Sequence, residues 1–452
     1  MRIAKVRLID QEQNQHYGIF AVALSLFAFA YSTRFGPIAI LAYYGLWLPL
    51  LFVDHRRVIG DPKRYAWLFV FAIFAIVSAF WSGAPGFSGR TAVQYFTHVV
   101  CALIAARTIN IRTLTRGMMV GTGIVLVYSL LFGIYLFDAL DGTFSFVGEF
   151  SSKNQLGFYA SLGVYFAFAG VFILRERQIW IALYGVVALL AGYCLIASQS
   201  ATSVLALAAV LALSVGMRFL GMLSPRHRKI FFTTLVVFGT ISAIAALYGG
   251  AFELILGAFG KDATLTGRTY LWQQGMEAAA QSPVFGVGYQ GFWVPGFSEA
   301  ERLWDDFFIE SRSGFHFHNT YIEAAVETGI IGLGLLCMVL ITNVLGHLKH
   351  LLARDEDVQS SILFGIAMLL FVRSFVEIDI MTPYQIGSFL LYYSAAKLTI
   401  PSRRTTNSAA DWPSRRTVAG EVPTARSVRR LAAARDAWNS VGVKRRGYTL
   451  SP

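Results

Sequence analysis

The chain has 452 residues, of which 56% are hydrophobic and only 14% are charged, and its mean hydropathy is +0.56. These values exclude a soluble globular protein, in which roughly a quarter of the residues are charged. The net charge of +12 excludes an acidic protein and must be assigned to loops, a tail or a ligand site. Composition therefore predicts an all-α polytopic membrane protein.

Apolar segments long enough to cross a bilayer recur along most of the chain. The first follows a basic start but no small-residue cleavage site, so we expect a retained helix and not a removed signal peptide. About 20 apolar residues span a bilayer as a helix. By this measure the sequence predicts about twelve transmembrane helices, over residues 17–33, 36–53, 65–81, 92–106, 117–137, 156–174, 179–197, 202–221, 230–249, 320–346, 360–380 and 384–400.

The basic residues alternate between connecting loops as the positive-inside rule requires. With the N-terminus in the cytoplasm every inner loop is cationic, whereas the outer loops hold few Lys or Arg. This pattern predicts that both termini are cytoplasmic and that one large loop, residues 250–319, is external. The inner-loop cations are Arg56, Arg57, Lys63, Arg64, Arg107, Arg112, Arg116, Arg175, Arg177, Arg226, Arg228, Lys229, Lys349 and Arg354.

The composition changes after the predicted transmembrane domain, residues 1–400. Residues 401–452 contain eleven Lys or Arg against three acidic residues, which accounts for +8 of the net charge. We expect a disordered cytoplasmic tail that is attracted to anionic lipid. Within it, residues 426–438 have the pattern of a short surface helix. Nucleic-acid binding is the alternative, but no nucleic-acid-binding fold accompanies the tail, and none is expected as a partner.

The external loop contains a match to the GxGxxG pattern at Gly286, Gly288 and Gly291. In dinucleotide-binding folds this pattern follows a strand and opens a helix. Here a Pro-containing turn precedes it and "FWVPGF" follows it, so we interpret it as a turn. Upstream, apolar spacing predicts an external helix over residues 268–281, with Arg268 at its start and Ser282-Pro283 ending it.

The stretch "FHFHNTYIEAAVETGIIGLGLL", residues 315–336, places polar side chains at the mouth of an apolar helix. Carboxylates inside a membrane span are costly and rarely lack a partner or a role. One interpretation is structural: Asn319 caps the helix, Glu323 and Glu327 pair with an external arginine, and His318 is a solvated loop residue. The other interpretation is a functional site built around His318.

A zinc site is a further alternative for the His-x-His pair of His316 and His318. Its remaining ligands would come from the acidic residues Asp305, Asp306 or Glu310. None of these has a regular ligand spacing, and we expect no metal.

Four cations lie against the positive-inside bias and are not explained by topology: Arg90, Lys153, Arg268 and Arg373. Arginine suits bidentate phosphate binding. For Arg373 the alternative is an ion pair within one helix with Glu377, four residues later. For Lys153, in "SSKNQLG", the alternative is a helix cap with a snorkelling lysine.

Together these motifs resemble the O-antigen ligase and polysaccharide polymerase superfamily, and the resemblance covers essentially the whole membrane portion. It rests on Gly267-Arg268 followed by Trp272, on "SPVFGVGYQGF", and on His318-Asn319 followed by Gly329-x-x-Gly332. "SSKNQLG" and "RSFVEIDI" look more like the exopolysaccharide polymerization proteins, such as those of succinoglycan, than like the ligases. Ligases usually carry small hydroxyl residues where this chain has Leu333, and the basic tail is not a family feature.

The resemblance implies a GT-C-like, metal-independent glycosyltransferase of the bacterial inner membrane, without cofactors and with a periplasmic active site. It implies that His318 is a general base on an acceptor hydroxyl and that cations hold the diphosphate of the donor. The glycines at 329, 332 and 334 are expected to permit close helix packing. The expected diphosphate-binding residues are Arg268, Arg90, Lys153 and Arg373, and the expected orienting residues are Asn319, Glu323 and Glu327.

The function expected from the resemblance is polymerisation of undecaprenyl-diphosphate-linked repeat units into exopolysaccharide or O-antigen. The alternative is ligation of such a polysaccharide to the lipid A core. Expected partners are the lipid-linked donor, a glycan or lipid A-core acceptor and membrane lipids, with a flippase and a chain-length regulator as further candidates. A secondary transporter fits less well, because the connection "RERQ" between the sixth and seventh predicted helices is short where a long central cytoplasmic loop is common.

Overall fold

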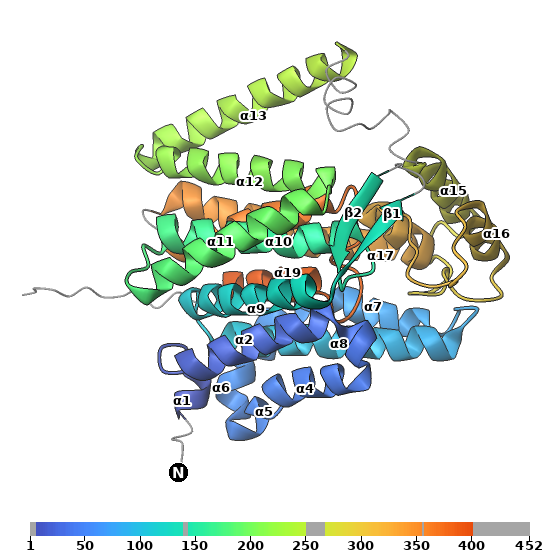
Figure 1. Cartoon of the computed structure of the whole chain (residues 1–452), viewed down its shortest axis with the longest axis horizontal. Helices are drawn as coiled ribbons and strands as arrows, with labels where there is room; N and C mark the ends of the chain where they lie inside the picture. The colour runs from blue at the N-terminus through green and yellow to red at the C-terminus, as the bar shows by residue number, and fades with distance from the viewer. Residues whose placement is uncertain (1–5, 139–142, 250–266, 355–356, 401–452) are drawn as a thin grey trace, which may run out of the picture. The chain divides into compact units, whose positions relative to one another are not determined.

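The computed structural model describes residues 6–138, 143–249, 267–354 and 357–400. The predictions for residues 250–266 of the long loop and for the basic tail, residues 401–452, lie outside these described residues. The described part is mainly helical, and most of its long helices run along one common direction (Figure 1).

The helices follow the apolar runs of the sequence, and α11 begins and ends at the residues that the sequence predicts. The first ten helices are α1 (Val6–Ile9), α2 (Gln15–Ala30), α3 (Ser32–Phe35), α4 (Pro37–Trp47), α5 (Leu50–Val53), α6 (His55–Ile59), α7 (Val70–Ser78), α8 (Pro85–Thr108), α9 (Ile111–Phe132) and α10 (Lys153–Phe168). The later helices are α11 (Ile179–Ala197), α12 (Ala201–Leu220), α13 (Pro225–Tyr248), α15 (Arg268–Gln281), α16 (Ser298–Asp306), α17 (Thr320–Ala353), α18 (Val358–Arg373) and α19 (Ile386–Thr399). A 3-10 helix covers Pro62–Leu68, and a π-helical turn, Ala169–Ile173, extends α10.

Five helices among the described residues are long and apolar enough to cross a membrane by themselves. They are α9, α10 with its π-helical turn, α11, α12 and α17. Three shorter apolar helical segments, Gln15–Ala30, Pro37–Val53 and Val358–Arg373, add to them. The chain is thus a multi-pass membrane protein by length and composition. The predicted count of about twelve spans is not confirmed, and the external position of the long loop stays a prediction.

A two-stranded hairpin corrects the all-α prediction. Strand β1 (Ile134–Asp138) pairs antiparallel with β2 (Thr143–Gly148), although the sequence analysis extended a helix to residue 137. Helix α9 ends earlier, at Phe132, and Gly133 follows in an extended conformation. The run "IYLF" is β-branched or aromatic at most positions, and such residues favour strands once a helix has ended.

Close helix packing in the first half depends on small residues. On α9, Gly117 and Gly121 are one GxxxG spacing apart and face α2. A Cβ atom at Gly117 would lie 2.6 Å from Val22, and one at Gly121 would lie 2.9 Å from the Cα of Ala23. Because lipid tails are as apolar as the side chains, close van der Waals contact of this kind stabilises membrane helix pairs.

Helix α17 contains a kink at Gly329, whose backbone has φ +61° and ψ −171°. The kink lets the 283–284 turn reach into the helix, where the N–H of Ile330 donates to the carbonyl of Pro283 at 2.9 Å. Gly332 also has close neighbours, whereas a Cβ at Gly334 would meet nothing within 4 Å. The short segment before the kink therefore carries the polar end of the helix. The expected packing role applies to Gly329 and Gly332 but not to Gly334.

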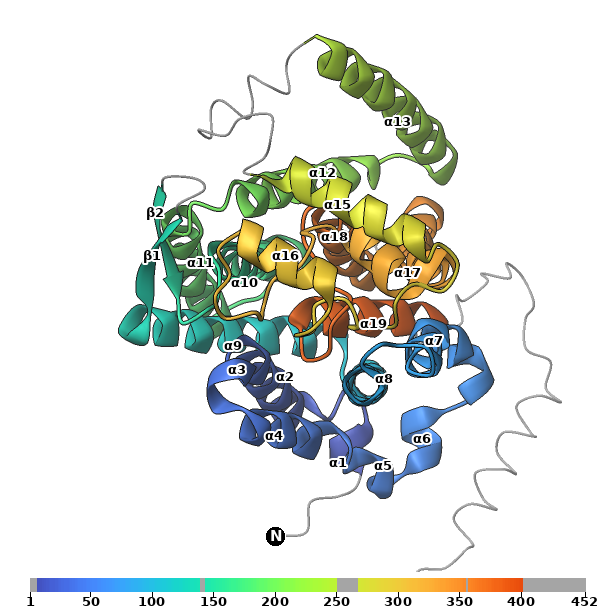
Figure 2. The same cartoon turned by 90° about the vertical axis from the view of Figure 1, so that its right-hand side faces the viewer.

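Helices α15 and α16 lie across one end of the bundle and pack near the start of α17 (Figure 2). Arg268–Gln281 has the bounds that the sequence predicts for the helix after Gly267. A small second core joins α15, α16 and the segment before α17 through Leu271, Ala278, Phe292, Ala300, Leu303, Trp304, Phe317 and Val326. The GxGxxG match is a turn, as predicted, with positive φ at Gly286 and Gly288.

Replacing Gly329 by Ala is expected to destabilise the protein. A backbone with φ +61° and ψ −171° is essentially restricted to glycine and costs an L-residue on the order of 1–3 kcal/mol, and the new Cβ would clash with the carbonyl oxygen of Val284. We expect the thermal midpoint of the detergent-solubilised protein to fall by several degrees. Gly334→Ala is the matched control on the same helix and should leave it unchanged; equal midpoints for the two variants would contradict the kink's role.

Candidate active site

The segment between α16 and α17 holds His318 in an unusual backbone conformation. Its φ is +50°, and its N–H donates to Nδ1 of His316 at 3.0 Å. A left-handed conformation is uncommon for residues other than glycine and needs local support. Here His316 supplies it, because its ring nitrogen accepts the hydrogen bond that the turned backbone offers.

Asn319 caps α17, as the structural interpretation predicts. Its Oδ1 accepts hydrogen bonds from the N–H groups of Tyr321 at 2.9 Å and Ile322 at 3.1 Å. Asparagine is among the preferred N-cap residues because it satisfies donors that have no partner within the helix. The cap fixes where α17 begins and hence where His318 lies.

The loop between α18 and α19 is fastened to the start of α17 by several hydrogen bonds. The N–H of Thr320 donates to the carbonyl of Ser374 at 2.9 Å, and its hydroxyl donates to the carbonyl of Glu377 at 2.6 Å. The side-chain amide of Asn319 donates to the carbonyl of Phe375 at 3.0 Å. These contacts bring the side chain of Glu377 next to His318.

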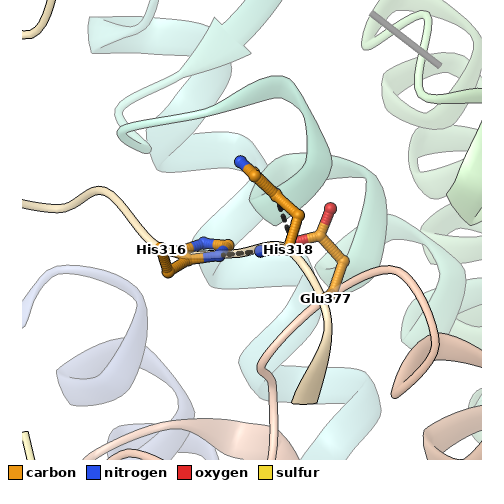
Figure 3. A group of neighbouring side chains, drawn as sticks. All are labelled: His316, His318 and Glu377. Carbon is orange, nitrogen blue, oxygen red and sulfur yellow. Dashed lines mark hydrogen bonds and ion pairs between the residues drawn. The ribbon is translucent and has the colours of Figure 1, made fainter. Parts of the chain in front are cut away.

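Glu377 lies at the centre of a polar cluster (Figure 3). Its Oε1 accepts from Nη2 of Arg268 at 3.2 Å and from Nδ2 of Asn154 at 2.8 Å. Its Oε2 lies 3.5 Å from Nδ1 of His318, which is too long for a good hydrogen bond. Nδ1 of His318 is buried and has no hydrogen-bond partner, so the carboxylate is the group it faces.

Exposure differs sharply within this cluster. The side chains of His318 and Arg268 are 24% and 16% exposed, whereas that of Glu377 is 7% exposed. Burial alone would raise the pKa of Glu377, but His318 and the guanidinium of Arg268 outweigh burial and hold that pKa well below its usual range. The cluster therefore presents an imidazole and a guanidinium outward over an ionised carboxylate.

His316 stays neutral at working pH. Burial, with a smaller contribution from the neighbouring His318, lowers the pKa of His316 to about 3. A neutral imidazole keeps one nitrogen as an acceptor. The hydrogen bond that supports the backbone of His318 is therefore retained across the neutral range.

Arg268 is positioned by the start of α15. Its Nη1 donates to the carbonyl of Val376 at 2.9 Å, in addition to the ion pair with Glu377. One turn later, Nε1 of Trp272 donates to the carbonyl of Phe317 at 2.9 Å, which locks α15 onto the segment carrying His318. A guanidinium has five N–H donors, so Arg268 keeps donors for a ligand.

The two glutamates of α17 brace loops, and neither pairs with an arginine in the described part of the chain, so the structural interpretation was wrong about their partners. Glu323 accepts from Nε1 of Trp293 at 2.9 Å and from the N–H of Phe317 at 2.8 Å. Glu327 accepts a hydrogen bond from Nε2 of Gln290 at 3.4 Å. Glu323 thus holds the backbone next to His318, and Glu327 holds the side chain of Gln290 in the turn before α16. The orienting role of both residues stays a prediction.

Arg373 lies behind the site and not at its surface. Its side chain is 1% exposed, and its Nε donates to Oδ2 of Asp379 at 2.6 Å. Its guanidinium also lies 4.2 Å from the centre of the Phe158 ring. The alternative ion pair with Glu377 is not formed, and a direct contact of Arg373 with a diphosphate does not fit this geometry.

Arg90 and Lys153 lie on other helices. Arg90 is an exposed residue near the start of α8, and its guanidinium lies 5.6 Å from the centre of the Phe87 ring. Lys153 is the first residue of α10, and Ser152 caps that helix as one alternative predicted. The residue that α10 sends to Glu377 is Asn154. A diphosphate contact by Arg90 or Lys153 stays a prediction.

His316, His318 and Glu377 also have the arrangement of a possible cation site, with one donor atom from each lying within 4.8 Å of the others. None of the acidic residues named for the zinc alternative belongs to this group. Arg268 already neutralises Glu377, and Nδ1 of His316 accepts from the backbone. These possible ligand atoms already have protein partners, so the geometry favours an ion-pair cluster over a metal site. The expectation of no metal stays a prediction.

Two contributors to the site, Asn154 and Glu377, were not predicted as site residues, and His316 was considered only as a zinc ligand. Glu377 was considered only as a partner of Arg373, and Asn154 only as part of a polar stretch. The signal available was the presence of further polar residues in "SSKNQLG" and "RSFVEIDI", both of which flank membrane helices. Their convergence depends on contacts between residues more than 100 positions apart, which spacing does not reveal.

Comparisons with known proteins agree with the motif. Residues 185–337 match the family described as O-antigen ligase. Over 404 residues the chain is 64% identical to the exopolysaccharide production protein ExoQ of Rhizobium meliloti (strain 1021), which covers 89% of this chain and 93% of that protein. The chain therefore belongs to the O-antigen ligase and polysaccharide polymerase superfamily, whose members are membrane enzymes acting on glycans.

Proposed function

We propose that this protein polymerises lipid-linked oligosaccharide repeat units into a surface polysaccharide. The donor is a glycan on undecaprenyl diphosphate, and the acceptor is a hydroxyl of another repeat unit. The site faces the periplasm from the inner membrane. The name of the R. meliloti relative, which refers to exopolysaccharide production, supports the polymerase over the ligase.

One observation carries the proposal: a partly exposed histidine and a partly exposed arginine meet over one buried carboxylate. Glycosyl transfer from a diphosphate needs a base at the acceptor hydroxyl and a cation at the leaving group. His318 and Arg268 supply these two groups side by side. Asn319 and Glu323 orient His318 by fixing the backbone on either side of it, and Glu327 holds the turn at Gln290.

The base is Nε2 of His318. Its other ring nitrogen, Nδ1, faces the carboxylate of Glu377 at 3.5 Å. A proton on Nδ1 directed at Glu377 leaves Nε2 unprotonated, as in other carboxylate–histidine pairs. Nε2 then takes the proton of the acceptor hydroxyl while the acceptor oxygen attacks the anomeric carbon. The contact with Glu377 is expected to shorten when substrate binds, because catalytic hydrogen bonds are often long without substrate.

Arg268 acts at the leaving group. As the bond between the anomeric carbon and the diphosphate oxygen breaks, its electron pair goes to the diphosphate. Two donors of Arg268 are engaged with Val376 and Glu377, and the remaining N–H groups are directed to the developing charge. The proton held by His318 is afterwards lost to water, which restores the base.

Ligation of finished polysaccharide to the lipid A core is the second candidate function. The match to the family described as O-antigen ligase favours it. Both reactions use the same donor chemistry and the same base, so the described site does not distinguish the acceptors. The products do.

The first test is complementation of a deletion strain with wild type or His318→Ala, followed by sizing of surface glycan and analysis of its lipid attachment. We expect single repeat units from the His318→Ala strain, because no base activates the acceptor. Loss of the reaction should exceed roughly a hundredfold. His55→Ala, which changes an exposed histidine on α6, is the matched control and should restore long polymer.

Other outcomes of that test would indicate a different function or a different mechanism. Long polymer that stays on the undecaprenyl carrier would identify a ligase. Wild-type glycan from His318→Ala would remove His318 from the mechanism. A changed accumulation of labelled solute with normal glycan would instead support a transporter.

A second test concerns His316. In His316→Asn the side-chain oxygen lies where Nδ1 lies and still accepts from the backbone of His318, whereas His316→Gln displaces its acceptor by one bond. We expect His316→Asn to keep most of the activity and His316→Gln to lose roughly tenfold or more. Since the pKa of His316 is lowered to about 3, the ring is already neutral, and His316→Asn should leave the pH profile unchanged between about pH 5 and 8. An altered profile would show that His316 itself titrates during the reaction.

A further inference from the structure

A line of polar side chains runs through the helix ends from Arg373 to Glu377. Nη1 of Arg373 donates to Oγ of Ser203 at 3.0 Å, and Ser203 lies 3.0 Å from Oγ of Ser200. Ser200 lies 2.9 Å from Oδ1 of Asn154, whose Nδ2 donates to Glu377 at 2.8 Å. These residues come from α10, α12 with its N-cap, α18 and the loop after it.

The direction of each hydrogen bond follows from counting hydrogens. A guanidinium has no acceptor, so Ser203 must accept from Arg373. Each serine has one hydroxyl hydrogen. Ser200 is the donor in its contact with Ser203 as well as in its contact with Asn154, and its one hydrogen cannot serve both. Because the amide oxygen of Asn154 can only accept, we assign the hydrogen of Ser200 to Asn154. This assignment satisfies the side-chain oxygen of Asn154 and turns its NH₂ group toward Glu377.

We propose that Ser200 and Asn154 form a one-way hydrogen-bond chain that orients Glu377 and, through it, His318. They are positioning residues and do not touch substrate. The inference rests on the proposed function, because it assigns Glu377 to orienting the base.

Arg373 lies beside the hydrogen-bond chain, and Asp379 balances its charge. Asp379 accepts from Nε at 2.6 Å and from Nη2 at 3.3 Å, so the guanidinium is held by both carboxylate oxygens. The chain thus brings Glu377 ordered dipoles and no additional net charge. Successive hydrogen bonds in a low-dielectric region polarise one another, and a buried carboxylate keeps one orientation when its acceptor sites are filled.

Two substitutions of Asn154 test the direction of the hydrogen-bond chain. Asn154→Asp keeps the shape and the oxygen that accepts from Ser200, but it places a second acceptor against Glu377. Asn154→Ala merely removes the donor. If the hydrogen-bond chain is directional, the reaction rate of Asn154→Asp should be lower than that of Asn154→Ala. If Asn154 only fills space, the order of the two rates should be the opposite. Ser200→Ala should lower the rate as well. Ser214→Ala in α12 is the matched control, because the Ser214 hydroxyl donates to the carbonyl of Val210 outside the hydrogen-bond chain.

The assay measures initial rates of polymer formation in membranes, with lipid-linked glycan extracted from the deletion strain as the probe. We expect kcat to fall roughly tenfold or more in Asn154→Asp while KM for the probe changes less than about twofold. Gel filtration of the solubilised protein confirms folding of each variant. A higher rate for Asn154→Asp than for Asn154→Ala would contradict the proposed hydrogen-bond chain. A raised KM with an unchanged kcat would also contradict it.

His318→Ala in the same assay separates this inference from the proposed function. An inactive His318→Ala together with the wrong order of the Asn154 variants overturns the chain alone. A fully active His318→Ala overturns the proposed base and, with it, the role given to the chain.

Discussion

The candidate site depends on keeping one buried carboxylate ionised. An unpaired charge inside a protein costs several kcal/mol or more, so Glu377 is tolerated in this position through its partners. Arg268 reaches it from α15, Asn154 from α10 and His318 from the segment before α17. Because these elements are far apart in the chain, the carboxylate is stabilised when the membrane helices and the loop helices are assembled together. The electrostatics of the site is in this sense a consequence of the completed fold.

The two arginines near the carboxylates differ in exposure, and this separates their roles. Arg268 is 16% exposed and keeps free N–H groups, whereas Arg373 is 1% exposed and is held by both oxygens of Asp379. Burial raises the pKa of Asp379, and Arg373 opposes that rise. A guanidinium packed in this way orders its surroundings, while a partly exposed one can receive a ligand.

Sequence patterns predicted the elements better than they predicted the site. Apolar periodicity placed α11 and α15 at their observed bounds, and cap chemistry identified Asn319, because these features depend on neighbouring residues. The i, i+4 rule paired Arg373 with Glu377, but α18 ends at Arg373, and Glu377 turns toward Arg268 instead. The hairpin after Phe132 was missed since its apolar residues continue the hydrophobic run of α9. Local patterns do not contain long-range partners, and the site consists mostly of such partners.

The pairing of Arg268 with Glu377 also suits the charge movement of the proposed reaction. Proton transfer creates a positive charge on His318, and bond cleavage places negative charge on the diphosphate. The first charge forms next to Glu377, and the second forms next to Arg268, so each arises beside a fixed charge of opposite sign. The net charge of the pocket stays constant while the dipole within it grows. An environment with its dipoles already fixed stabilises such a change without reorganisation, so an ion pair suits a site that we propose also binds an anion.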